Sequence, residues 1–299
     1  MFIDTHVHIT LPNQAVLHHK LSLEEYIIKL DEIGGGKGVL FINPFDNKYC
    51  CHNSIVDGRL HKSKIINNDS RNYSIMCEGC NSVHYVGEDI FRDDNVRLIQ
   101  MAKENGMYAL AFLTAPDKSI QNQVDFYEKN YPEFLGYKIH PTIMMFPADK
   151  LSINSNKTIV FHCGNDEYAS PNQILKFAEN YSGNVVIAHF ARFDKAALKE
   201  ISRRDNVWID MSPFTFLYGL IESRPNQLCC SLNDYTYESA QELFMSLVEC
   251  VGYDKIIFSS DDPFGDLKKE AEFIKDLNLD TLELELIKVN NAKKAFGII

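Results

Sequence analysis

The chain of 299 residues predicts an α/β fold in which eight strand–helix units close into a (β/α)8 (TIM) barrel. Three observations predict it. Apolar runs such as GVLFIN, which are typical of strands buried on both faces of a parallel sheet, alternate with amphipathic helical segments. Eight such units can be counted from the N-terminus. A doubly wound open sheet is the alternative, but the sequence has no glycine-rich phosphate turn after the first strand to support it.

The first unit pairs the strand FIDTHVH with the helix SLEEYIIKLDEIGGG. Side chains of a strand alternate between its two faces, so His6 and His8 are expected to point the same way, together with Asp4. Ser22 and Glu25 fit a capping box at the helix start, and three consecutive glycines end the helix.

The remaining units repeat this alternation. The predicted strands are GVLFIN, YALAFL, LGYKIH, TIVFHCG, VVIAHF, VWIDMS and KIIFSSD. The predicted helices are DDNVRLIQMAKENG, residues 118–130, SPNQILKFAENYSG, DKAALKEISRR, ESAQELFMSLVECVG and DLKKEAEFIKDL. Pro171 stands at the first helical position of its segment, where the missing backbone N–H is tolerated.

Two long segments interrupt the pattern, residues 44–92 after strand two and residues 213–233 after strand seven. Both follow the C-terminal end of a strand, so we expect them to overhang the barrel mouth as loops. The first contains CCHN and CEGC, which suggest either a structural zinc site or ordinary loop thiols. We interpret residues 1–299 as one domain that carries the 44–92 segment as an insertion.

Composition narrows the classes of partner. The chain has 41 acidic against 30 basic residues, a net charge of −11 and no basic cluster, which argues against nucleic acid and anionic membranes. No apolar run approaches the roughly 20 residues that span a bilayer, and no signal peptide is visible. The eight cysteines therefore predict reduced thiols. We expect a cytoplasmic protein with a small-molecule substrate, and we leave open its assembly into a homo-oligomer.

Metal-ligating and acid–base residue types recur at the C-terminal ends of the predicted strands. They are His6 and His8 (strand one), Lys138 and His140 (strand four), His162 (strand five), His189 (strand six), and Asp261 and Asp262 (strand eight). In a barrel these ends converge on one mouth. Imidazoles with a carboxylate suit Zn²⁺, Mn²⁺ or Fe²⁺, with coordination positions left for water or substrate.

Together, FIDTHVH, GYKIHP, VFHCG, IAHF and FSSDDPF resemble the amidohydrolase superfamily, in particular its amidohydrolase-related (amidohydrolase 2) branch of metal-dependent TIM-barrel hydrolases. The closing segment VNNAKKAFGI resembles the last helix of that branch. The resemblance covers nearly the whole chain except the two long segments. It is specific at the level of the superfamily and weaker at the level of substrate. It implies a divalent metal at the mouth, with Zn²⁺ ranked before Mn²⁺ or Fe²⁺ and one ion before two.

The resemblance also implies roles for individual residues. The implied metal ligands are His6, His8, His162 and Asp261, with Asp262 as the alternative to Asp261. His189 matches a histidine that binds a second metal in some members and contacts the reacting group in others. Lys138 matches a lysine that is either carboxylated between two metals or placed beside a single one.

The expected activity is hydrolysis of an amide, ester or lactone. The metal would activate a water molecule, and Asp261 would move a proton from this water to the leaving group. The metal, with His189 or Lys138, would polarise a carbonyl oxygen. His140, Arg192 and Phe214 are candidates for substrate binding.

The alternative activity is a lyase reaction, decarboxylation or hydration, because the same branch contains such enzymes. A carboxylated substrate would favour an arginine at the mouth, where only Arg192 and Arg224 are obvious candidates, so hydrolysis ranks first. A non-catalytic ligand-binding barrel is the third hypothesis, and the intact set of ligand residues argues against it.

Overall fold

Eight parallel strands form one sheet in the computed structural model, which describes residues 1–12, 14, 19–44, 55–56, 59–60, 63–69, 72–77, 83–86, 89–114, 119–223 and 235–299. In sheet order the strands are β1 (Phe2–Ile9), β2 (Gly36–Ile42), β8 (Tyr108–Leu113), β9 (Gly136–Ile139), β10 (Thr158–Phe161), β11 (Val185–Ile187), β12 (Val207–Asp210) and β13 (Ile256–Ile257). Their buried aliphatic and aromatic side chains form one continuous core.

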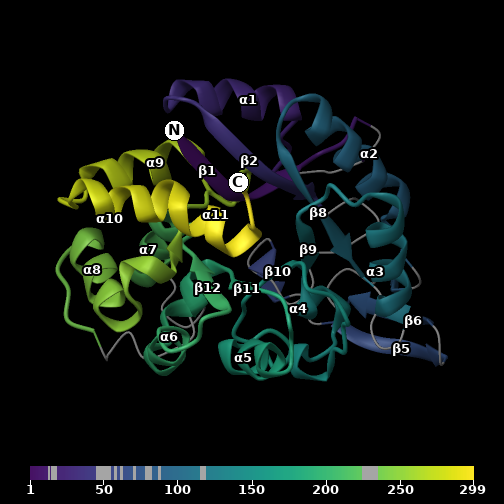
Figure 1. Cartoon of the computed structure of the whole chain (residues 1–299). Helices are drawn as coiled ribbons and strands as arrows, with labels where there is room; N and C mark the ends of the chain where they lie inside the picture. Colours follow the sequence, from purple (N-terminus) through teal and green to yellow (C-terminus); the bar gives the residue numbers. More distant parts are fainter. Residues whose placement is uncertain are drawn as a thin grey trace.

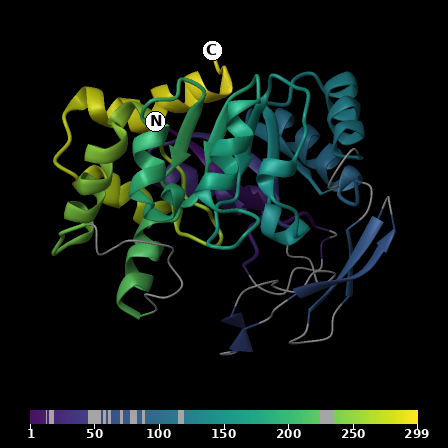
Figure 2. The same cartoon turned by 90° about the horizontal axis from the view of Figure 1, so that it is seen from below.

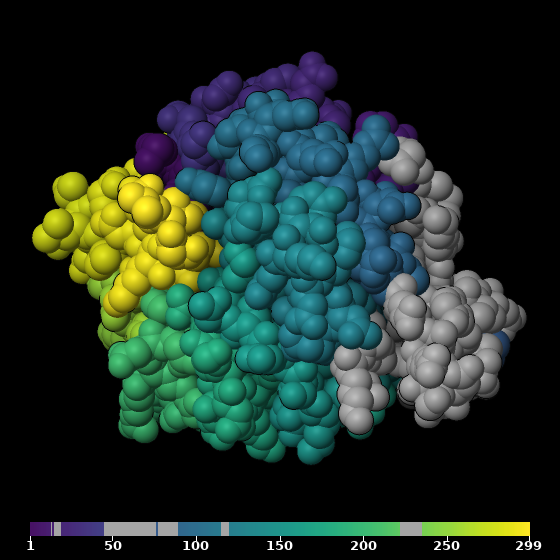
Figure 3. Space-filling model, turned by 45° about the vertical axis from the view of Figure 1, so that its right-hand side comes forward, coloured from purple at the N-terminus to yellow at the C-terminus, as the bar shows by residue number. Residues whose placement is uncertain are grey.

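The sheet closes nearly into a barrel because β1 meets the chain that follows β13. The Thr5 amide donates to the Phe258 carbonyl at 3.2 Å, and the His8 amide donates to the Asp262 carbonyl at 2.9 Å. The first and last elements of the chain therefore lie side by side (Figure 1), and their surfaces adjoin in Figure 3. The predicted (β/α)8 barrel is confirmed.

Most helices lie on the outside of the barrel, whereas the last one, α11, lies across the end of the barrel at which β10 and β11 begin (Figure 1). They are α1 (Leu23–Glu32), α2 (Arg92–Glu104), α3 (Ser119–Asn130), α4 (Pro141–Met144), α5 (Pro171–Glu179), α6 (Lys195–Ile201), α8 (Ala240–Val251), α9 (Leu267–Asp276), α10 (Thr281–Glu285) and α11 (Asn291–Phe296). The capping box of Ser22 and Glu25 is present as predicted. Among the described residues, no helix combines the length and the apolar character needed to cross a membrane.

Residues 44–92 were expected to be a loop, but short antiparallel strands form within them. They are β3 (Ile55–Val56) paired with β4 (Arg59–Leu60), and a three-stranded sheet of β5 (Ser63–Asp69), β6 (Asn72–Cys77) and β7 (Val83–Val86). In Figure 2, β5 and β6 lie toward the end of the barrel opposite to the two chain termini. The side chains of CCHN and CEGC, on which the structural-zinc hypothesis depends, lie outside the described residues.

The segment after β12 differs from the prediction. Residues 214–223 were expected to be loop, but they form helix α7 (Phe214–Ser223). The buried side chains of Phe214 and Leu217, one helical turn apart, anchor this helix to the core. Residues 224–234, which include Arg224, lie outside the described residues.

The expectation for Asp4 was wrong. The pairing of β1 with β2 shifts register between Asp4 and Val7, as in a β-bulge, so the alternation of side chains does not run unbroken from Asp4 to the histidines. Asp4 instead accepts hydrogen bonds from the Tyr26 hydroxyl of α1 at 3.2 Å and from Ser260 Oγ at 2.7 Å.

Candidate metal centre and active site

His6, His8 and Asp261 converge at the mouth of the barrel, where β1 ends beside the segment after β13. Nε2 of His6 and Nε2 of His8 each lie 3.2 Å from the same carboxylate oxygen, Oδ1 of Asp261. His189 completes a candidate metal site, because ligand atoms of His6, His189 and Asp261 lie within 4.8 Å of one another. All four side chains are buried.

Asp210 fixes the protonation of His6. Oδ2 of Asp210 lies 2.7 Å from Nδ1 of His6, and since a carboxylate only accepts, Nδ1 carries the proton. Burial, with the nearby Lys138 charge, holds the pKa of His6 well below its usual value, so the imidazole is neutral near pH 7. Nε2 of His6 therefore presents a lone pair toward Asp261.

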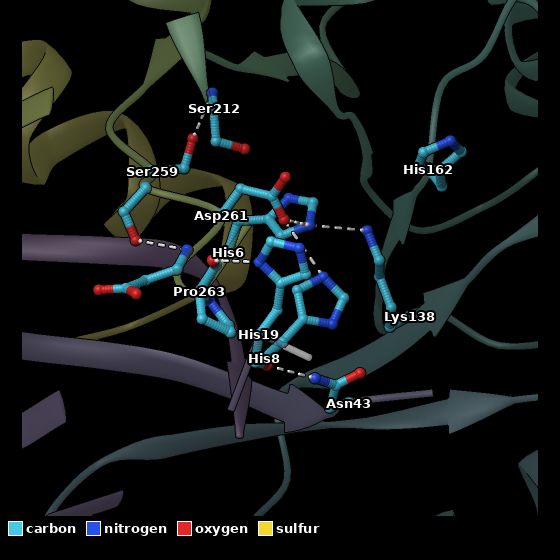
Figure 4. Close-up of polar contacts among 12 residues, drawn as sticks. His6, His8, His19, Asn43, Lys138, His162, Ser212, Ser259, Asp261 and Pro263 are labelled. Carbon is cyan, nitrogen blue, oxygen red and sulfur yellow. Dashed lines mark hydrogen bonds and ion pairs between the residues drawn. The ribbon is translucent and has the colours of Figure 1, made fainter. Parts of the chain in front are cut away.

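Lys138 of β9 lies beside this pair and is fully buried. Its Nζ lies 3.2 Å from Nε2 of His6 and 4.9 Å from the centre of the Phe41 ring. Burial lowers the pKa of Lys138 to about 8, although the carboxylates of Asp210 and Asp261 act in the opposite direction. Figure 4 shows its ammonium group reaching toward His6 and Asp261.

His189 was expected at the end of a strand, but β11 ends at Ile187 and His189 begins a left-handed turn. All five residues of this turn, His189 to Phe193, have φ between +47° and +61°, although none is glycine. Such a conformation costs about 1–2 kcal/mol for each L-residue. Tertiary contacts hold it: the His189 amide donates to Oδ1 of Asp210 at 3.1 Å, and the Tyr235 hydroxyl donates to the Phe193 carbonyl at 3.1 Å.

His162 reaches the site through His189. Nδ1 of His189 donates to the Ser212 carbonyl at 2.8 Å, which leaves Nε2 of His189 as an acceptor 2.9 Å from Nδ1 of His162. On its other side His162 stacks on His140, with ring centres 3.7 Å apart. In Figure 4, His162 stands apart from the group around Asp261. Burial lowers the pKa of all three imidazoles.

The two adjacent aspartates after β13 face different partners. Asp261 contacts His6 and His8, whereas both carboxylate oxygens of Asp262 accept from Nζ of Lys29 at 2.8 and 2.9 Å. Of the two, the structure therefore brings Asp261 to the histidines.

The three candidates for substrate binding occupy different places. His140 lies against His162, and its Nδ1 accepts from the Ile143 amide at 3.3 Å. Arg192, within the left-handed turn, donates from Nε to the Cys163 carbonyl at 2.7 Å, and its charge lowers the pKa of His162.

Phe214 packs in the core behind His189. Its ring contacts among the described residues are with four other phenylalanines, Phe190, Phe193, Phe244 and Phe273, at centre distances of 5.0 to 5.9 Å. Phe190 and Phe193 belong to the left-handed turn, so the ring of Phe214 packs against this turn.

Two aromatic neighbours of the histidines were missed in the sequence. The Phe41 ring lies 4.5 Å from the His8 ring and 5.0 Å from the His6 ring, and the Phe264 ring lies 5.0 Å from the His8 ring. The signal for Phe41 was its position near the end of strand two, where it pairs with His8. These rings wall the site with apolar surface.

The donor set fits a divalent cation. The lone pair of His6 Nε2 and the anionic Oδ1 of Asp261 are two acceptors 3.2 Å apart, an arrangement that a cation between them stabilises. Asp210 on the far nitrogen of His6 is the carboxylate–histidine pairing found behind metal ligands. His6, His8, His189 and Asp261 would hold the ion, with Lys138 beside it. His162, predicted from the sequence as a ligand, lies instead next to His189, with its Nδ1 2.9 Å from Nε2 of that ring.

Comparisons with known proteins agree with this architecture. A model of the family described as "Amidohydrolase" matches residues 82–298, well over half of the chain. A comparison with curated proteins finds no match.

Solved structures with the same fold span the whole chain. 5-Carboxyvanillate decarboxylase from Sphingomonas paucimobilis has a TM-score of 0.62 at 11% identity, covering 100% of this chain and 99% of its own. A dihydroxybenzoic acid decarboxylase from Polaromonas sp. JS666, with bound manganese, has a TM-score of 0.60 at 11% identity, covering 99% and 97%. A candidate 2-pyrone-4,6-dicarboxylic acid hydrolase from Pseudomonas putida has a TM-score of 0.57 at 14% identity, covering 99% and 97%.

At these identities the likeness establishes the fold, and the family model establishes the family. Since that model covers most of the barrel, and the histidines and aspartate converge at the mouth where this fold carries its active sites, the chain belongs to the amidohydrolase family.

Proposed function

We propose that this chain is a metal-dependent hydrolase that cleaves an amide, ester or lactone bond of a small molecule. The observation that carries the proposal is the convergence of His6 and His8 on Asp261, because Nε2 of each imidazole lies 3.2 Å from Oδ1 of that carboxylate while Nδ1 of His6 is held by Asp210. A divalent cation bound there would acidify a water molecule and polarise a carbonyl oxygen.

The side chains around the candidate metal site have different catalytic roles in this proposal. Asp261 is the buried carboxylate placed to take a proton from water and return it to the leaving group. Lys138 is the buried ammonium that can donate a hydrogen bond to a carbonyl oxygen as negative charge develops on it. The rings of Phe41 and Phe264 limit the access of bulk water to the two histidines.

Decarboxylation is the second candidate function, and Arg192 is the observation that favours it. Its guanidinium charge acts on both His162 and His189, so a substrate carboxylate could pair with it beside the site. Of eight similar solved structures, five are decarboxylases by name, and two of these five have bound manganese. We therefore propose a divalent ion without choosing Zn²⁺ over Mn²⁺.

The test uses metal-stripped protein reloaded with either Zn²⁺ or Mn²⁺. One arm measures acid release, meaning formation of the carboxylic acid product, from a panel of lactones, esters and amides. The other arm measures CO2 release from aromatic carboxylates. We expect metal-dependent acid release, lost in the His6→Ala/His8→Ala double variant because both imidazoles on Asp261 are removed. Circular dichroism checks that the double variant keeps its fold.

Each outcome decides between the hypotheses. CO2 release without hydrolysis would overturn the first proposal in favour of the second. Stoichiometric metal binding with no turnover in either arm would overturn both and favour a ligand-binding barrel. Full metal occupancy in the double variant would refute the assignment of His6 and His8 as ligands.

A further inference from the structure

We infer that Asp210, at the end of β12, is a positioning residue that orients two candidate metal ligands from different strands. It sets which nitrogen of His6 is free for the metal, and it holds the start of the left-handed turn that carries His189. This role rests on the proposed metal-dependent function, because only a bound metal would need the two histidines oriented. The hydrogen bonds of Asp210 are the same whichever reaction the metal supports.

The two carboxylate oxygens of Asp210 have separate tasks. Oδ2 accepts from Nδ1 of His6 at 2.7 Å. Oδ1 accepts from the His189 amide at 3.1 Å, from the Ser212 amide at 3.1 Å and from Ser212 Oγ at 2.8 Å. The side chain is fully buried, so bulk solvent does not reach these contacts. One carboxylate thus connects β1, the turn after β11 and the end of β12.

The ring of His189 is held by Ser212, the residue whose amide and hydroxyl donate to Asp210. Ser212, which donates twice to Oδ1 of Asp210, offers its own carbonyl to Nδ1 of His189 at 2.8 Å. Both the backbone and the ring of His189 are therefore fixed by the Asp210–Ser212 segment. The Nδ1 contacts leave Nε2 of both rings without a proton, so both imidazoles offer Nε2 as the acceptor nitrogen, that of His189 beside Nδ1 of His162 and that of His6 beside Nζ of Lys138.

An Asp210→Asn variant separates this role from simple packing. Three donors surround Oδ1, so the amide oxygen of asparagine must occupy that position and its NH₂ group must face His6. An NH₂ group only donates, so Nδ1 of His6 must become the acceptor and the proton must move to Nε2. The lone pair that would bind the metal is then lost, although the shape of the site is unchanged.

The experiment measures the protonated ring nitrogen of His6 by long-range ¹H–¹⁵N NMR in metal-free protein, with the signal assigned from His6→Ala. We expect Nδ1–H in the wild type and Nε2–H in Asp210→Asn. Titration with Zn²⁺ and Mn²⁺ should show a 10- to 100-fold loss of affinity in the variant, the usual effect of removing such a partner. Ser212→Ala is the matched control: it removes one donor to Oδ1 but leaves Oδ2 on His6, so Nδ1–H should persist.

An Nε2–H signal in the wild type would overturn the inference even if Asp210→Asn does not fold. So would a folded Asp210→Asn that keeps Nδ1–H and full metal affinity. If the wild type binds neither metal, the proposed function fails, while the His6 protonation state in metal-free protein still tests the role of Asp210.

Discussion

Glu270 of α9 is a buried carboxyl whose ionisation should contribute to the dependence of stability on pH. Its Oε1 accepts from the Thr215 amide at 2.9 Å and from Thr215 Oγ1 at 2.6 Å, which ties α9 to the first turn of α7. Its Oε2 has no hydrogen-bond partner among the described residues. Burial raises the pKa of Glu270 from 4.5 to about 8, because an apolar surrounding penalises the charged form.

Glu270→Gln keeps the shape of the side chain and removes its charge. Since the pKa of Glu270 is higher in the folded than in the unfolded chain, the folded state binds the proton more tightly. The contribution of Glu270 to the free energy of unfolding therefore falls as pH rises from about 4.5 to about 8. At about 1.4 kcal/mol per pKa unit, ionised Glu270 costs the folded state up to ~5 kcal/mol above that range. We therefore expect Glu270→Gln to be ~2–5 kcal/mol more stable than the wild type near pH 9.

Urea unfolding, followed by the fluorescence of the single tryptophan, Trp208, measures this difference at both ends of the range. Near pH 4.5 the two proteins should differ by no more than ~1 kcal/mol, because both side chains are then neutral in the folded chain. Glu272→Gln is the matched control, an exposed position in the same helix, and should change stability little at either pH. A stability difference between Glu270→Gln and wild type that is equal at both pH values would refute the reasoning.

Two further predictions follow from the mouth of the barrel. Asp261→Asn should lower kcat at least ~10²-fold because it removes the candidate proton acceptor. Asp262→Asn should keep most of the activity but lower the melting temperature, because it weakens the ion pair with Lys29. If instead Asp262→Asn loses activity and Asp261→Asn keeps it, Asp262 is the proton acceptor. Ala191→Val should lower the free energy of unfolding by at least ~2 kcal/mol, since a β-branched side chain is strained at the left-handed φ of +47°. Urea unfolding checks the second prediction, and a neutral effect would contradict the left-handed turn.

The sequence by itself determined the barrel and most of the residues at its mouth. Strand and helix periods are local properties, and in parallel strands every C-terminal end lies on one side, so His6, His8, Lys138 and Asp261 could be placed together from their positions alone. The same reasoning predicted α7 as loop, because its apolar residues lack an obvious polar face and only the packing of Phe214 and Leu217 reveals the helix.

Only the tertiary structure decided how these residues contact one another. Alternation fails where strands end or bulge: the shift after Asp4 turns that carboxylate toward α1, and the φ of +58° at Asp261 separates it from its neighbour Asp262. The role of Asp210 depends on His6, 204 positions away, and on a turn of residues that rarely adopt positive φ. No local pattern encodes such contacts, because they exist only once the closed barrel brings β1, β11 and β12 to the same mouth and its packing compensates for the strain.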